Sequence, residues 1–251
     1  MAKNFSRAGP PILFQPAAFL IHNPFMTDPA PNSELLRSLG KLARGLSALF
    51  WGLPVSLVAC VETARPAWLK SFGVAPALAA TALLVFGLWQ MSDFQKQERP
   101  WRNALDRAKL LGLVNFGLCP FLVWHNQMPR EAFFNLSVFT LVFSAILFLF
   151  SLNLVIKRLG AMLPDETLRH ETALFTALNC WLLTFLFLLT VAYTILLRIS
   201  QMPLEFSFLF AWMDRFGLWL LTFFALLPLA MTMALIWKTK ETILDSVFDA
   251  K

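Results

Sequence analysis

Six apolar stretches of this chain, each 15 to 26 residues long, contain no Asp, Glu, Lys or Arg. A helix needs roughly 20 apolar residues to cross the hydrocarbon core of a bilayer, which is about 30 Å thick. The stretches cover residues 46–61, 73–91, 110–124, 132–156, 172–197 and 216–237. They predict an all-α, polytopic integral membrane bundle with six transmembrane helices.

The composition agrees with a chain whose solvent is largely lipid. Hydrophobic residues make up 58% of the 251 residues and charged residues 14%, and the mean hydropathy is +0.63. An ordinary soluble domain is about 45–50% apolar and about 25% charged. These values exclude a disordered tail, a disulfide-stapled secreted scaffold and a DNA-binding domain.

The basic residues are distributed unevenly between the two sides of the predicted spans. Sixteen of the 21 Lys and Arg residues lie in alternate inter-span segments, beginning with the segment before the first span. Because Lys and Arg are retained on the cytoplasmic side, both termini are predicted to be cytoplasmic. The net charge of +6 then indicates contact with anionic lipid headgroups, and no nucleic-acid partner is needed to explain it. We expect a multi-pass protein of the plasma membrane, which is the inner membrane in a bacterium.

The region before the first span divides into two predicted parts. Six of the 15 prolines fall within the first 31 residues, which favours an irregular arm. From Ser33, leucines recur at helical spacing with Arg37 and Lys41 on the other face, which predicts an amphipathic interfacial helix. A second interfacial segment is predicted at residues 206–213, because Asp214 and Arg215 separate it from the last span. The predicted organisation is a Pro-rich cytoplasmic arm at 1–32, the amphipathic helix at 33–45, the transmembrane domain at 46–237 and a cytoplasmic tail at 238–251.

No ionisable residue lies well inside a predicted span, so the asparagines are the most informative polar residues there. In the predicted orientation Asn115, Asn153 and Asn179 all fall in the cytoplasmic half of the bilayer. They are candidate ligand-binding residues that form one polar cluster. Alternatively, each makes an unrelated hydrogen bond between helices.

The segment 157–171 carries a histidine and several carboxylates at the start of the fifth predicted span. Glu166 and His170 are four residues apart, on one helical face, a spacing that suits a ligand, a divalent metal or a general base. However, carboxylates also favour a helix N-terminus, and no second histidine lies at ligand spacing. We therefore assign no metal, cofactor or catalytic residue.

The segment 93–109 combines basic residues with one tryptophan. We predict that it binds anionic lipid headgroups. A docking surface for a cytoplasmic partner is the alternative. The predicted headgroup residues are Arg99, Trp101, Arg102 and Arg107.

The three cysteines are far apart in sequence and show no paired spacing, so they are predicted to be small apolar packing residues. The chain also lacks a phosphate-binding loop, a nucleophile elbow and a zinc-protease motif. The leading hypothesis is therefore a non-enzymatic accessory, scaffolding or assembly subunit of a membrane complex, with a protein partner or a homo-oligomer. The alternatives are a carrier or channel with Asn115, Asn153 and Asn179 at a cytoplasmic vestibule, and a membrane enzyme that acts on a lipid.

Overall fold

The computed structural model describes residues 30–64, 72–95, 97–162, 166–198 and 207–248, and within these ranges the regular structure is entirely helical. The predicted arm therefore lies outside the described residues up to residue 29. The α-helices are α1 (Ala30–Ala64), α2 (Ala75–Gln90), α3 (Arg99–Leu118), α4 (Phe121–Gln127), α5 (Ala132–Met162), α6 (Glu166–Arg198) and α7 (Ser207–Phe248), with a 3₁₀ turn, η2 (Met91–Asp93), after α2.

Six helical segments among the described residues are long and apolar enough to cross a membrane, and each overlaps one predicted span. The segments are Arg37–Ala64, Ala75–Asp93, Arg99–Gln127, Ala132–Met162, Arg169–Ala192 and Thr222–Asp245. The prediction of an all-helical fold with six helices long and apolar enough to span a membrane is therefore confirmed.

The N-terminal region differs from the prediction. The structure has one continuous helix, α1, where the sequence predicted the end of an arm, a separate interfacial helix at 33–45 and a span that begins at residue 46. The leucine stripe explains the continuity, because it crosses the expected boundary without interruption. Leu42, Leu46, Leu49 and Leu53 are all buried in the main core. The stripe therefore packs against other helices, where the prediction placed it on the bilayer surface.

The structure also differs from the prediction around the third predicted span. Most of the segment 93–109, predicted as a loop, is helical because α3 begins at Arg99, with Pro100 in its first turn, where proline is tolerated. The predicted span 110–124 is then interrupted between α3 and α4. Pro120 lies at this break and has no backbone N–H to continue the helical ladder.

The last crossing extends further than expected in both directions. Helix α7 runs through Asp214 and Arg215 without a break, so the residues predicted as a separate interfacial segment belong to the same helix from Ser207 onward. The predicted tail at 238–251 is likewise helical as far as Phe248. Charged residues thus mark where the apolar stretch ends, while the backbone helix continues past them.

The close packing of α1 against α2 depends on two glycines. A Cβ atom built on Gly45 would lie 2.7 Å from the Gly87 carbonyl oxygen, and one built on Gly87 would lie 3.0 Å from the Gly45 carbonyl oxygen. The two backbones therefore touch directly. Such contacts between small residues are the usual means of helix association where lipid removes the hydrophobic driving force.

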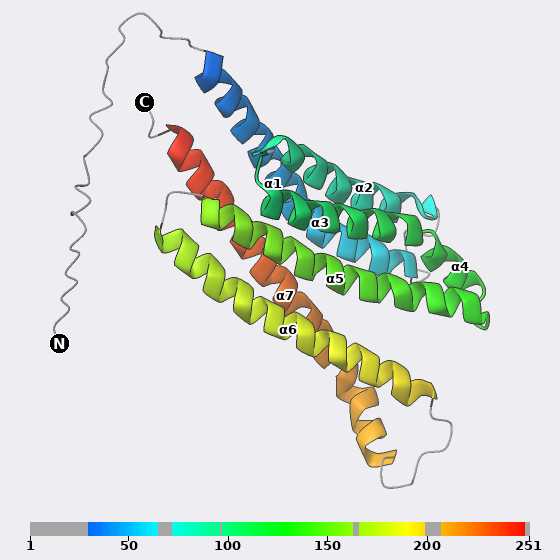
Figure 1. Ribbon diagram of the computed structural model, residues 1–251. Coiled ribbons are helices and arrows are strands. Elements are labelled where there is room, and N and C mark those ends of the chain that lie inside the picture. The colour runs from blue at the N-terminus through cyan, green and yellow to red at the C-terminus, as the bar shows by residue number, and fades with distance from the viewer. Residues whose placement is uncertain (1–29, 65–71, 96, 163–165, 199–206, 249–251) are drawn as a thin grey trace, which may run out of the picture.

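The helices form one elongated bundle (Figure 1). The beginnings of α1, α3 and α6 and the ends of α5 and α7 lie together at one end. We call it the charged end, because the ion pairs between Lys41 and Asp93 and between Glu171 and Lys238 lie there. Helix α5 is central, since it packs against α3, α4, α6 and α7. The main hydrophobic core takes its buried residues from α1, α2, η2, α3, α5 and α7, whereas the buried α6 residues Leu183 and Leu186 belong to a smaller cluster with Ile146.

We predict that Gly45→Ala destabilises the protein by about 1–3 kcal/mol, the usual cost of overpacking a tight contact. Gly40→Ala is the matched control, because a Cβ at Gly40 of the same helix meets nothing within 4 Å. It should be neutral or stabilising by up to about 1 kcal/mol, since alanine favours helix. Unfolding of both variants in mild detergent measures the difference. Equal stability of the two variants would contradict the direct backbone contact.

Candidate functional site

Three buried polar side chains join α5, α6 and α7. Asn179 of α6 donates from Nδ2 to Asn153 Oδ1 of α5 at 3.0 Å and to Thr232 Oγ1 of α7 at 2.9 Å. The Nδ2 atom of Asn153 also lies 3.0 Å from Thr232 Oγ1. All three side chains are fully buried, with 0% exposure. We call Asn153, Asn179 and Thr232 the polar triad.

Main-chain carbonyl groups complete this network. The carbonyl oxygen of Pro228 accepts from Asn179 Nδ2 at 3.2 Å and from Thr232 Oγ1 at 2.8 Å. Asn153 Nδ2 in turn donates to the Leu149 carbonyl oxygen at 2.8 Å. The polar triad is therefore anchored to the backbones of both α5 and α7, so that α6 is held by groups that are fixed in position.

Two buried oxygens on α6, Asn179 Oδ1 and Thr176 Oγ1, have no hydrogen-bond partner among the described residues. Thr176 precedes Asn179 by about one helical turn and is also buried. The side-chain N–H groups of Asn153 and Asn179 thus donate hydrogen bonds, while two oxygens of α6 can still accept one.

The structure brings together only part of the predicted asparagine cluster. Asn153 and Asn179 hydrogen-bond to each other, whereas Asn115 lies on α3 and shares no hydrogen bond with them in the described part of the chain. The Asn115 side chain is buried, and its Oδ1 has no hydrogen-bond partner within the described ranges. Sequence reasoning missed Thr232, although it lies one turn after Pro228, where a hydroxyl can bond to a carbonyl four residues back.

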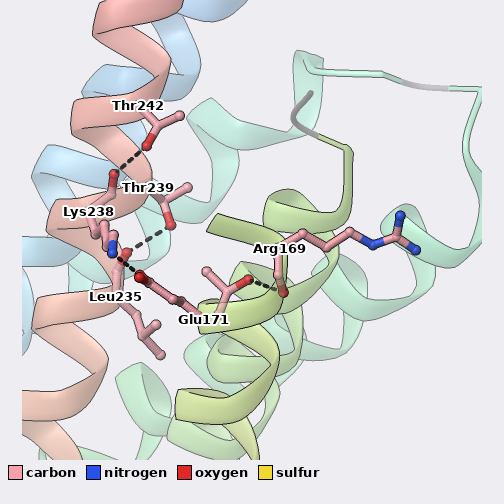
Figure 2. Close-up of polar contacts among 7 residues, drawn as sticks. Arg169, Glu171, Leu235, Lys238, Thr239 and Thr242 are labelled. Atoms are coloured by element: carbon pink, nitrogen blue, oxygen red, sulfur yellow. Dashed lines mark hydrogen bonds and ion pairs between the residues drawn. The ribbon is translucent and has the colours of Figure 1, made fainter. Parts of the chain in front are cut away.

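Glu166 and His170, the predicted pair at the start of α6, are both exposed. Within the described ranges, no group of three or more His, Cys, Asp and Glu side chains is placed to hold a metal ion. The carboxylate that makes an interhelical contact in this region is Glu171, which forms an ion pair with Lys238 of α7 (Figure 2).

Threonines support the helix ends around this ion pair, as Figure 2 shows. Thr239 donates to the Leu235 carbonyl oxygen at 2.8 Å, and Thr242 donates to the Lys238 carbonyl oxygen at 3.1 Å. A second ion pair at the charged end joins Lys41 of α1 to Asp93 of η2. Because both pairs are about half exposed, each contributes little free energy and mainly fixes which helix ends are adjacent.

The predicted headgroup residues divide into two groups. Arg99, Arg102 and Arg107 are exposed near the start of α3. Trp101, by contrast, is fully buried, and its Nε1 donates to the Phe94 carbonyl oxygen at 3.1 Å. The prediction that Trp101 contacts headgroups is therefore wrong for this ring, because its polar atom is satisfied inside the protein.

Two of the three cysteines approach each other despite their separation in sequence. Cys60 Sγ of α1 lies 3.8 Å from Cys119 Sγ at the break between α3 and α4. Cys119 is fully buried, as a packing residue would be, and Cys180 is a free thiol on α6. No spacing signal could have indicated this pair, since it results from how α1 packs against α4.

A shallow apolar groove runs between α5 and α6, and we call it the α5/α6 groove. It begins about one turn from the polar triad, since Phe150 precedes Asn153 by three residues and Leu183 follows Asn179 by four. Thr184 is its one hydroxyl-bearing residue, and that hydroxyl already donates to the Cys180 carbonyl oxygen at 2.8 Å. The lining residues are Ile146, Leu147, Phe150, Leu183, Thr184 and Phe187.

We predict that Thr232→Val destabilises the bundle by about 1–2 kcal/mol. The variant loses two hydrogen bonds between helices, and each contributes on average roughly 0.6 kcal/mol in a membrane protein. Thr184→Val is the matched control, because Thr184 also bonds to the carbonyl four residues back but is exposed, and among the described residues it makes no hydrogen bond to another helix. Reversible unfolding in mixed detergent micelles measures both. A loss in Thr184→Val equal to that in Thr232→Val would contradict the role of the polar triad.

No protein-family model, no curated protein sequence and no solved structure matches this chain. The function must therefore be argued from the chain's own residues.

Proposed function

We propose that this protein is a non-enzymatic accessory, scaffolding or assembly subunit of a membrane complex. The observation that carries the proposal is the apolar α5/α6 groove, which lies within two segments long enough to cross a membrane. Its lining side chains are branched and aromatic, and they suit the side chains of another transmembrane helix. The occupant is either a helix of a partner protein or a helix of a second copy.

The polar triad supports this role, because it holds α5 and α6 together at the end of the groove nearest to Asn153 and Asn179. Helix α6 takes part in the smaller hydrophobic cluster and in the polar triad, so these contacts determine its distance from α5. A groove with a fixed width can select one helix surface over others. The triad is then a positioning element, and the contact with a partner is made by the groove residues.

The two alternative functions receive less support. A vestibule lined by Asn115, Asn153 and Asn179 requires free amide groups on one cavity. However, the Asn153 N–H groups donate to Thr232 of α7 and to the Leu149 carbonyl oxygen, and the Asn179 amide donates to Asn153 of α5. The exposed positions of Glu166 and His170 leave a lipid enzyme without a shielded pair of catalytic groups. Burial is what usually shifts the pKa values of catalytic groups into the range that their chemistry needs.

We further propose that the charged end of the bundle faces the cytoplasm and binds anionic lipid. Arg99, Arg102 and Arg107 are exposed near the start of α3, at the end where α1 begins and α7 ends. Lys240 lies 5.5 Å from the centre of the Trp237 ring, a cation–π arrangement suited to the interface between lipid and water. In a bacterium this membrane is the inner membrane.

The orientation is tested with single cysteines in a variant that lacks Cys60, Cys119 and Cys180. Gln127→Cys and Glu241→Cys place an exposed thiol at opposite ends of the bundle. We expect a membrane-impermeant maleimide to label Gln127→Cys in intact cells, and Glu241→Cys only after the membrane is permeabilised. The reverse pattern would overturn the orientation.

The subunit role is tested by crosslinking in the native membrane. A photoreactive amino acid at Leu147, which lines the α5/α6 groove and is 46% exposed, should give a crosslinked protein band. Val142 is the matched control, because it lies on the same helix with 40% exposure and outside the set of groove residues. The same crosslinked protein should co-purify with the chain in mild detergent.

Two outcomes would contradict the proposal. One is a chain that purifies alone and as a monomer. The other is that the photoreactive residues at positions 147 and 142 crosslink only to lipid, and to an equal extent. A crosslinked band with the mass of two copies of this chain would identify the partner as a homo-oligomer.

A further inference from the structure

The sulfur atoms of Cys60 and Cys119 form the one cysteine pair in the described part of the chain. They are 3.8 Å apart, although 59 positions separate the two residues in sequence. Cys60 is four residues from the end of α1, and Cys119 lies at the break between α3 and α4. The pair therefore bridges two crossings at the end of the bundle opposite the charged end (Figure 1).

The local structure holds the Cys119 thiol toward α1. Pro120 interrupts the helix, and Cys119 Sγ also lies 3.9 Å from the Ala77 carbonyl oxygen of α2. Ala59, next to Cys60, is buried, as is Ala77. These small residues allow α1, α2 and the α3–α4 break to approach closely, so the two thiols meet where three elements converge.

The two thiols differ in access. Cys119 is fully buried, whereas Cys60 is only partly buried. An external reagent would thus meet Cys60 first, and Cys119 is already positioned to react with Cys60. This asymmetry is the arrangement found in dithiols that react by exchange, in which one cysteine is attacked and the other resolves the product.

We propose that Cys60 and Cys119 form a reversible disulfide by exchange with an external organic disulfide. The Cys60 thiolate attacks one sulfur of that disulfide, its S–S bond breaks, and one thiol leaves. The Cys119 thiolate then attacks Cys60 Sγ in the mixed disulfide and releases the second thiol. The two cysteines lose two electrons and two protons in total, and the external disulfide is reduced to two thiols.

The proposed orientation is consistent with this chemistry. With the charged end in the cytoplasm, the cysteine pair lies toward the extracytoplasmic side, where disulfides persist. Formation of the disulfide would link α1 covalently to the break between α3 and α4. The ion pairs at the charged end hold other helix ends together, and the disulfide would link helix ends at the opposite end of the bundle.

Counting free thiols tests the proposal, and Cys180 serves as an internal reference. Purified full-length protein in mild detergent is treated with oxidised glutathione or with dithiothreitol, quenched with acid and denatured. It is then labelled with a maleimide that carries a polyethylene glycol chain. We expect three labels per chain after reduction and one after oxidation, and later reduction should restore all three.

Variants identify which cysteines react. Cys180→Ser should change from two labels to none on oxidation, while Cys60→Ser should keep two labels in both states. Mass spectrometry of the oxidised protein should recover a peptide that joins Cys60 to Cys119. Three labels after oxidation, a linkage that includes Cys180, or a crosslinked dimer in place of an internal linkage would each overturn the proposal.

Discussion

A side-chain amide inside a bilayer has no water to bind, so each amide must find its partner within the protein. The polar triad meets this requirement for the side-chain N–H groups and links α5, α6 and α7, because Asn179 donates to an asparagine, a threonine and a backbone carbonyl. Helix α6 depends on this most, since its buried leucines belong to the smaller hydrophobic cluster. The triad therefore helps to position α6 beside the α5/α6 groove, together with the tight contact between Gly160 of α5 and Thr172 of α6.

The two halves of the molecule associate by different physical means. Helices α1 and α2 meet through glycine backbones and a buried leucine stripe, which gives a tight and largely apolar contact. The triad joins α6 to α5 and α7, and an ion pair between Glu171 and Lys238 also links α6 to α7, which itself contributes to the main core. Directional polar contacts fix the orientation of α6, and the open apolar α5/α6 groove lies beside them.

The sequence predicted the six long apolar helices because hydrophobic length is a local property of the chain. It failed where the outcome depends on a neighbour: α1 is one helix because its leucine stripe packs on a core that the sequence does not display. Trp101 is buried for the same reason. Of the candidate site, the contact between Asn153 and Asn179 followed from their similar depth, whereas Thr232 and the cysteine pair arise from tertiary packing that no spacing reveals.

The glycine contact between α1 and α2 also constrains how this protein can change over generations. Every replacement of Gly45 adds at least a Cβ atom, and that atom would lie 2.7 Å from the Gly87 carbonyl oxygen. Residue 87 is already glycine, the smallest residue, so a second substitution there cannot make room for a larger side chain at position 45. A single substitution at either glycine can therefore disrupt the packing register between these two helices, but it cannot shift that register in small steps.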